Sequence, residues 1–222
     1  MKKICILIPT FNEAKTIGQI IRDLKRLSLA AYVVDDGSAD ESASISEREG
    51  AVVMRHPRNM GKGAALRTGF ERILRDGFDA VLVMDGDGQH TIEDVERFIK
   101  EEEYIGADMI IGNRMLETSA MPRHRVVTNK FMSGVISRLS GQYVPDTQCG
   151  FRLIKREVLQ KVKLESSNYE IESEMILLAA RERFTIESLP IKTVYRDEKS
   201  RINPLVDTLR FIMLMAKILC RR

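Results

Sequence analysis

The feature that most constrains the fold is a regular alternation of short apolar segments with helical patterns in the first half of the chain. The apolar segments are rich in β-branched residues, and a polar or glycine-bearing turn follows each of them. They lie at Ile4–Ile8, Tyr32–Val34, Ala51–Met54, Ala80–Met84 and Met109–Ile111. Because these runs are apolar throughout, they predict the strands of a mostly parallel sheet that helices cover on both faces.

Helical patterns fill the intervals between these strands. Thr16 with Gln19, and Thr91 with Asp94, have the spacing of a capping box, and apolar residues recur at helical spacing after each pair. Further helices are predicted over Asp40–Glu49, Gly63–Arg75, Val126–Leu139 and Tyr169–Arg183. The resulting order of elements indicates a doubly wound α/β domain, whose ligands gather beyond the carboxyl ends of the strands.

Composition narrows the classes of protein that this domain can belong to. The 222 residues contain neither a repeat nor a low-complexity linker, which favours one continuous domain. A balance of 35 Lys and Arg against 32 Asp and Glu leaves a net charge of +3, which disfavours dedicated nucleic-acid binding. Cys5, Cys149 and Cys220 are far apart, so they form no local zinc knuckle and are typical of a reducing cytosol. The apolar run after Lys3 is too short for a signal peptide.

Polar residues follow four of the predicted strands, at positions 9–13, 35–38, 56–63 and 85–90. One such segment is typical of any loop, but four of them at the same edge of a sheet indicate a binding site.

The segment after the fourth strand carries the most specific signal. Asp85 and Asp87 are hard oxygen ligands that suit Mg²⁺ or Mn²⁺ bound together with substrate phosphates, and Gln89 adds a neutral oxygen. Gly86 and Gly88 permit the turn that would direct both carboxylates to one site. The alternative is an acidic turn that caps the following helix, although Thr91 already supplies a cap.

Other polar residues give weaker signals. Lys62 either contacts a phosphate or caps a glycine turn, and both interpretations stay open. We expect His56, His90 and His124 to be solvent-facing loop residues without a functional role, because they lack zinc-helix spacing. Cys149 is expected to be a small packed side chain. The sequence has neither the glycine–lysine order of a P-loop nor a complete dinucleotide fingerprint.

Five motifs taken together resemble a known family. They are Pro-Thr-x-Asn-Glu after the first strand, Val-Asp-Asp-Gly-Ser at 34–38, Asn-x-Gly-Lys-Gly-x-Ala at 59–65, Asp-x-Asp at 85–87 and Asp-Thr-Gln-Cys-Gly-Phe-Arg at 146–152. In this order and spacing the chain, from about residue 4 to 203, resembles the family 2 glycosyltransferases of GT-A fold. The similarity is strongest to dolichol-phosphate mannose synthases and bacterial polyprenyl-phosphate glycosyltransferases.

The resemblance implies a division of the chain and a role for particular residues. It implies a GT-A domain over 1–203, with a nucleotide-binding half at about 1–113 and an acceptor half with a mobile loop at 114–203, followed by an amphipathic helix at 204–222. Donor-binding residues would be Pro9, Phe11, Glu13, Asp36, Lys62, Asp85 and Arg196, with Asp85, Asp87 and Gln89 as metal ligands. Catalysis would involve Asp87, Arg114, Arg125 and Arg201, and acceptor contacts would come from Asn129 and Gln148.

The activity that the resemblance implies is the inverting transfer of a hexose from a nucleotide sugar, of GDP-mannose or UDP-glucose type, to polyprenyl or dolichyl phosphate. A phosphate monoester has its second pKa at about 6, so its oxygen can attack the sugar without an enzymic base. The alternatives are a family 2 transferase with a soluble or saccharide acceptor and, less consistent with the acidic pair, a nonenzymatic interaction module.

The C-terminal segment bears on how a lipid acceptor reaches the site. It is mostly apolar from Leu205 to Leu219, but charged residues interrupt it and it is shorter than the roughly 20 residues that span a bilayer. One predicted helical face contains Leu205, Leu209, Ile212, Met213, Ala216 and Leu219. This face predicts a peripheral protein on the cytoplasmic side of a membrane. Packing on the domain, in a homodimer or against a membrane-protein partner stays open.

Overall fold

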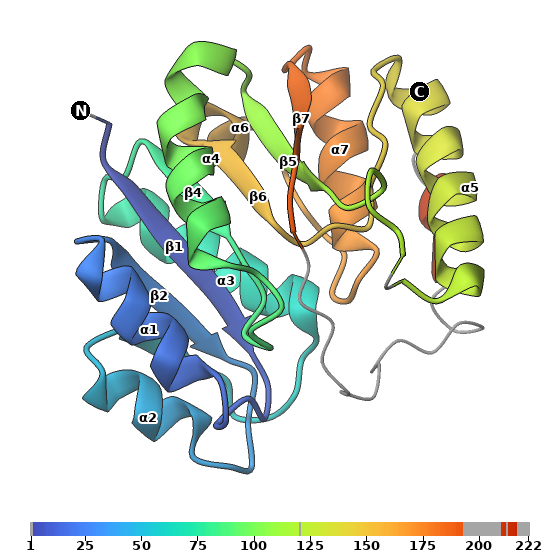
Figure 1. Cartoon of the computed structure of the whole chain (residues 1–222). Helices are drawn as coiled ribbons and strands as arrows, with labels where there is room; N and C mark the ends of the chain where they lie inside the picture. The colour runs from blue at the N-terminus through green and yellow to red at the C-terminus, as the bar shows by residue number, and fades with distance from the viewer. Residues whose placement is uncertain (1, 120, 193–209, 212, 217–222) are drawn as a thin grey trace.

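A seven-stranded sheet forms the centre of the molecule (Figure 1). The structure is a computed structural model that describes residues 2–119, 121–192, 210–211 and 213–216. The strands are β1 (Ile4–Thr10), β2 (Ala30–Asp35), β3 (Val52–Arg55), β4 (Ala80–Val83), β5 (Met109–Asn113), β6 (Arg152–Lys155) and β7 (Ile186–Pro190). Their order is β3-β2-β1-β4-β6-β5-β7, and only β6 runs antiparallel to its neighbours. The predicted mostly parallel α/β fold is confirmed.

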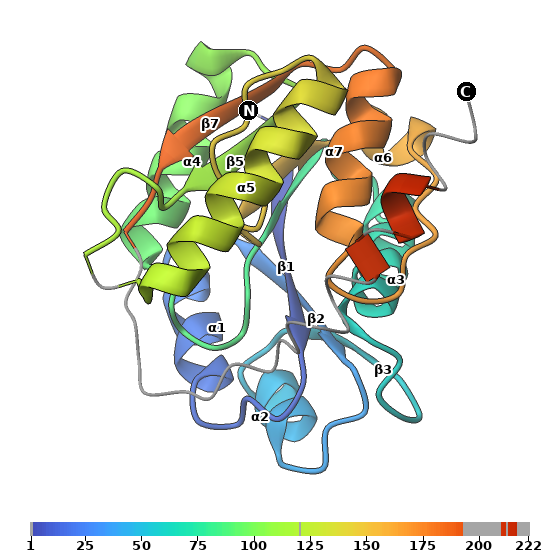
Figure 2. The same cartoon turned by 90° about the vertical axis from the view of Figure 1, so that its right-hand side faces the viewer.

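Helices cover both faces of this sheet. They are α1 (Ile17–Arg26), α2 (Ser42–Arg48), α3 (Lys62–Arg75), α4 (Ile92–Ile105), α5 (Arg123–Ser140), α6 (Arg156–Lys161) and α7 (Ile171–Arg181). Figure 2 shows α1 and α4 on one side of the sheet and α3, α6 and α7 on the other. Helix α5 lies on the outside of the second half and packs against α7.

The core runs without a break through both halves of the chain. Cys5 to Ile8 of β1 are fully buried, as are Leu153 and Ile154 of β6. The ring of Phe151 packs edge-on against Phe98 of α4, with 4.8 Å between the centroids. Because β6 inserts between β4 and β5, residues after 113 share one sheet and one core with those before it.

All five predicted strands are present, but the sequence analysis missed β6 and β7. Strand β6 reads Arg-Leu-Ile-Lys and β7 reads Ile-Glu-Ser-Leu-Pro, so neither has a continuous β-branched apolar run. Their pairing partners, which are distant in sequence, determine that they are strands. For β6, those partners are β4 and β5 on either side.

The two predicted helix caps had different outcomes. The hydroxyl of Thr91 accepts a hydrogen bond from the backbone N–H of Asp94 at 3.2 Å, as predicted. The side-chain cap predicted at Thr16 is wrong, because its hydroxyl donates to the carbonyl oxygen of Gly86 at 2.5 Å. Thr16 therefore joins the start of α1 to the loop that follows β4.

Part of the C-terminal segment lies within the described residues, and it is helical at 210–211 and 213–216. Phe211 and Leu214 are buried, whereas Met213 of the predicted apolar face is 54% exposed. The described part therefore packs on the domain through residues that the predicted face did not include. Among the described residues, no helix is both long enough and apolar enough to cross a bilayer.

Candidate active site

The topology brings every motif of the sequence analysis to one edge of the sheet. The parallel strands β1, β2, β3, β4 and β5 end at this edge, and the antiparallel strand β6 begins there. Loops that leave the parallel strands therefore meet the loop at 146–150, which enters β6. This one reversal of direction makes a late segment of the chain part of the site.

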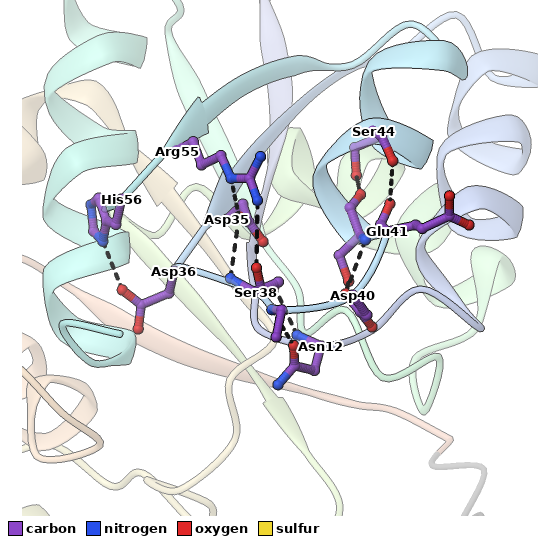
Figure 3. Close-up of polar contacts among 12 residues, drawn as sticks. Asn12, Asp35, Asp36, Ser38, Asp40, Glu41, Ser44, Arg55 and His56 are labelled. Carbon is purple, nitrogen blue, oxygen red and sulfur yellow. Dashed lines mark hydrogen bonds and ion pairs between the residues drawn. The ribbon is translucent and has the colours of Figure 1, made fainter. Parts of the chain in front are cut away.

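Hydrogen bonds join the loops that follow β1 and β2, as Figure 3 shows. The backbone N–H of Asn12 donates to Ser38 Oγ, and Asn12 Oδ1 accepts from the N–H of Ala39, both at 2.8 Å. The N–H of Glu13 donates to Ser42 Oγ at 2.7 Å. Asn12 reaches these partners at a φ of 54°, a left-handed conformation that Asn tolerates better than most residues. These bonds fix the shape of the predicted donor side of the site.

Asp36 organises the loop after β3. Its carboxylate accepts hydrogen bonds from the backbone N–H groups of Met60 at 2.9 Å and Gly61 at 2.8 Å. Oδ1 also lies 2.7 Å from His56 Nδ1 (Figure 3). His56 Nε2 lies 2.9 Å from the hydroxyl of Thr68. The expectation of a solvent-facing His56 was wrong, because the chain buries its ring between Asp36 and α3.

An open cavity of about 400 Å³ lies beside this Asp36–His56 pair. Its lining residues are Gly37, Ser38, Arg55, His56 and Pro57. Half-buried Pro9, Phe11 and Glu13 lie at the end of the adjacent strand β1, where the N–H of Asp36 donates to the carbonyl of Thr10 at 2.8 Å. The structure thus gathers the residues predicted for the nucleoside pocket, and their donor contacts stay predictions.

Lys62 is a half-buried cation that contacts Asp85, the first residue of the acidic pair. Its Nζ lies 2.6 Å from Oδ1 of Asp85 and 2.8 Å from Oε1 of Glu172 on α7. Burial opposes the charged form of Lys62, but the two carboxylates outweigh it and raise the pKa of the ammonium. Burial likewise opposes ionisation of Asp85, yet the charge of Lys62 holds the pKa of this carboxyl well below its usual range. Neither interpretation of Lys62 from the sequence included this ion pair.

Gly150 brings its backbone directly against this ion pair. A Cβ atom at position 150 would lie 2.7 Å from Oδ2 of Asp85 and 2.9 Å from Nζ of Lys62. Only glycine fits there without displacing a charged group. This close contact explains why the 146–152 motif has glycine at position 150.

Asp87 has no cation within salt-bridge distance among the described residues. Its Oδ1 accepts a hydrogen bond from the backbone N–H of Gln89 at 2.9 Å, and Gln89 is half-buried beside it. Burial is the main cause that raises the pKa of Asp87, and the negative charge of Asp85 is the second. A cation bound beside Asp87 would favour its charged form and so offset both its burial and its repulsion from Asp85.

These residues fit a divalent metal that substrate helps to bind. Within the described parts of the chain, no group of three or more His, Cys, Asp or Glu side chains is arranged to hold a metal. The protein would supply the Asp85 and Asp87 carboxylates, and phosphate oxygens and water would provide most ligands, as is common for Mg²⁺.

His90 is a residue at this site that the sequence analysis assigned no role. Its side chain is only 5% exposed, and Nε2 lies 3.8 Å from Oδ2 of Asp85. The ring packs on Phe151, with 4.8 Å between centroids, and its buried Nδ1 has no hydrogen-bond partner among the described residues. The prediction of a solvent-facing His90 was wrong. His124 is exposed as expected, but it lies in the first turn of α5 and not in a loop.

Arg114 forms a bidentate pair with Asp146. Its Nε and Nη2 donate to the two carboxylate oxygens at 2.7 and 2.9 Å, and its backbone N–H donates at 3.0 Å. Asn129 of α5 donates to the same carboxylate at 2.7 Å and accepts from Ser133 at 3.0 Å. Burial opposes ionisation of Asp146, but Arg114 outweighs it and lowers the pKa of the carboxyl. Asn129 is therefore buried under the site rather than open at its surface.

A buried arginine shapes the loop that precedes β6. The guanidinium of Arg152 donates to the carbonyl oxygens of Cys149, Glu172 and Thr147 at 2.8, 2.6 and 2.8 Å. Cys149 is fully buried, as predicted, and burial raises the pKa of its thiol to about 12. The sequence placed Arg152 in a motif but gave no signal of this role.

Two more predicted site residues lie at the same edge, and two lie outside the described residues. Arg125 is half-buried in the first turn of α5, and Gln148 is half-buried in the loop that leads to β6. Arg196 and Arg201 lie outside the part of the chain that the structure describes.

Comparison with known proteins identifies the class of enzyme. Residues 5–163 match the family described as Glycosyl transferase family 2, and the chain belongs to this family and is a glycosyltransferase.

Two relatives and one solved structure are similar to the chain over most of its length. The chain is 28% identical to the UDP-N-acetylglucosamine–dolichyl-phosphate N-acetylglucosaminyltransferase of Methanococcus voltae, over 88% of this chain and 87% of the relative. It is 29% identical to the polyprenol monophosphomannose synthase of Mycolicibacterium smegmatis, over 86% of this chain and 77% of the relative. Its fold matches Mycobacterium tuberculosis glucosyl-3-phosphoglycerate synthase, crystallised with Mn²⁺, UDP and phosphoglyceric acid. The TM-score is 0.74 at 18% identity, over 98% of this chain and 78% of the other.

Proposed function

We propose that this enzyme transfers a hexose from a nucleotide sugar to a polyprenyl phosphate, with inversion at the anomeric carbon. The observation that carries the proposal is the acidic pair after β4, in which Lys62 compensates Asp85 while Asp87 faces no cation within the described residues. This difference between the two carboxylates suits a site in which a divalent ion and the diphosphate of the donor bind together. The names of the two relatives above support a lipid phosphate as the acceptor.

The roles follow from the chemistry of each group. Asp85 and Asp87 would hold Mg²⁺ or Mn²⁺, and the metal would neutralise the departing nucleoside diphosphate. Pro9, Phe11 and Glu13 would line the nucleoside pocket. Asp36 would act there largely through the loop that it holds.

The acceptor side needs positive charge rather than a base. A lipid phosphate is already anionic at neutral pH, so the protein has to hold two repelling phosphate groups together. Arg125 supplies a half-buried guanidinium for this task, and Asp146 orients Arg114 through two hydrogen bonds. Gln148 lies in the adjoining loop. We place the enzyme peripherally on the cytoplasmic side of a membrane, where a lipid phosphate is accessible.

The test is a matrix of donors and acceptors. GDP-mannose, UDP-glucose and UDP-N-acetylglucosamine would each be incubated with a short-chain polyprenyl phosphate and Mg²⁺ or Mn²⁺, and the product anomer read by NMR. Formation of a glycosyl phosphate lipid of inverted configuration supports the proposal. Transfer only to a soluble acceptor such as phosphoglycerate, or retention of configuration, would overturn it.

A further inference from the structure

Two large apolar side chains of α5 face away from the protein. Val127 and Phe131, one turn apart, are 69% and 70% exposed. The opposite side of the same helix is buried through Asn129, Ser133 and Ile136. In Figure 2, α5 lies on the outside of the molecule, and no described element covers its outer side.

The charge of α5 differs from that of the chain as a whole. Residues 123–140 contain four Lys and Arg residues and no Asp or Glu, although the whole chain has 35 basic and 32 acidic residues. Arg123, Lys130 and Arg138 are exposed on the outer side, together with Val127 and Phe131. Exposed apolar side chains on a helix that carries cations and no carboxylates are typical of a helix that lies on an anionic bilayer.

The inner side of this helix belongs to the site. Asn129 donates to the Asp146 carboxylate that orients Arg114, and Arg125 lies in the first turn. A helix with its side chains is about 10 Å across, so a bilayer on the outer side would lie about one helix diameter from these groups.

We infer that the outer side of α5, formed by Arg123, Val127, Lys130, Phe131 and Arg138, is a membrane-contact surface for anionic lipid. This inference rests on the proposed lipid-phosphate acceptor and specifies how such an acceptor approaches: the bilayer presents the phosphate at the first turn of α5. The surface is distinct from the C-terminal segment, whose described residues Phe211 and Leu214 are buried on the domain.

The first test measures binding to vesicles by flotation, with phosphatidylcholine alone and with about one third phosphatidylglycerol. The double variant Val127→Ser/Phe131→Ser should reduce partitioning into the anionic vesicles on the order of tenfold, because it removes most of the apolar area that the bilayer would bury. Lys130→Glu should reduce it by a similar factor through charge alone. Tyr104→Ser, which changes an 84% exposed side chain on α4, is the matched control and should bind as the wild type does.

Three results would overturn the inference. They are absence of wild-type binding to anionic vesicles, unchanged binding by the double variant, and a fall in oligomeric mass of that variant by light scattering, which would assign the surface to a second copy of this chain. Circular dichroism should show the wild-type melting temperature, because the substituted side chains are exposed.

A second measurement separates this inference from the proposed function. With a short-chain polyprenyl phosphate in free solution, the double variant should retain wild-type turnover, whereas with a long-chain acceptor in vesicles its turnover should fall with its binding. If the wild type fails on every lipid phosphate, the proposed function is wrong, and the vesicle experiment still decides whether α5 contacts lipid. Equal loss on both acceptors would mean that α5 acts on the site and not through the membrane.

Discussion

The Nζ atom of Lys62 lies 2.6 Å from Oδ1 of Asp85 and 2.8 Å from Oε1 of Glu172, so one half-buried lysine joins α3, the loop after β4 and α7. The three side chains carry one positive and two negative charges. Asp85, the carboxylate that we propose as a metal ligand, is therefore already held in place by a cation of the protein.

Replacing this cation should destabilise the fold. Lys62→Met leaves Asp85 and Glu172 without their shared partner, which should lower the free energy of unfolding by about 3–5 kcal/mol. The double variant Lys62→Met/Glu172→Gln should recover part of this loss, because it removes one of the two uncompensated charges. Urea unfolding of both variants and the wild type measures the difference. A loss below about 1 kcal/mol in the single variant would show that solvent screens the pair.

Asp87→Asn should separate activity from stability. We expect turnover to fall by at least about 100-fold, because a metal facing the leaving diphosphate loses one anionic ligand. Since burial and Asp85 raise the pKa of Asp87, its charge opposes folding, and its removal should leave the free energy of unfolding unchanged or slightly higher. Steady-state rates, Mn²⁺ binding in the presence of nucleoside diphosphate and thermal melts measure these effects. Glu103→Gln, at an exposed position of α4, is the control. Full activity of Asp87→Asn in chelator-treated buffer would contradict the metal assignment.

Gly150→Ala tests the close approach of the backbone to the Lys62–Asp85 pair. The new methyl group would lie 2.7 Å from Oδ2 of Asp85, so the pair has to move, at a cost of about 1–3 kcal/mol in stability. Gly134→Ala is the matched control, because a Cβ there meets nothing within 4 Å and α5 should gain up to about 1 kcal/mol. Thermal melts of the two variants should therefore shift in opposite directions. An unchanged or higher melting temperature of Gly150→Ala would contradict the packing described at position 150.

The Asp146 carboxylate predicts a pH dependence of stability. Its pKa is lowered in the folded protein, so its stabilising effect is fully present above the unfolded value of about 3.9 and is lost as pH falls through the lower folded value. Asp146→Asn should cost about 3 kcal/mol at pH 7, and the difference from the wild type should shrink below about pH 4. Urea unfolding of both proteins at pH 7, 5 and 3 measures it. A difference that stays constant down to pH 3 would argue against a charge-based contribution of Asp146.

Several features could be predicted from local sequence because their causes are local. The apolar run Ala80–Met84 predicts a buried strand, and the hydroxyl of Thr91 caps the next helix as its spacing from Asp94 predicts. The cap predicted at Thr16 was wrong because a carbonyl in another loop, that of Gly86, competes for the same hydroxyl. Local spacing shows which hydrogen bonds a side chain can form within its own segment. It contains no information about a hydrogen-bond partner from a segment that is distant in sequence.

The sequence by itself determined the five parallel strands, the edge of the sheet where polar loops gather, and the family to which the chain belongs. These follow from patterns within a few residues, in which periodicity and turn chemistry act over one element. Only the tertiary structure decided that β6 runs antiparallel between β4 and β5, and that reversal brings Gly150 and Asp146 to Lys62 and Arg114. It also decided that His56 and His90 are buried, because residues distant in sequence enclose them. The ion pair of Lys62 joins groups 23 and 110 positions apart in sequence, so its partners are chosen by the packing of α3, β4 and α7 together.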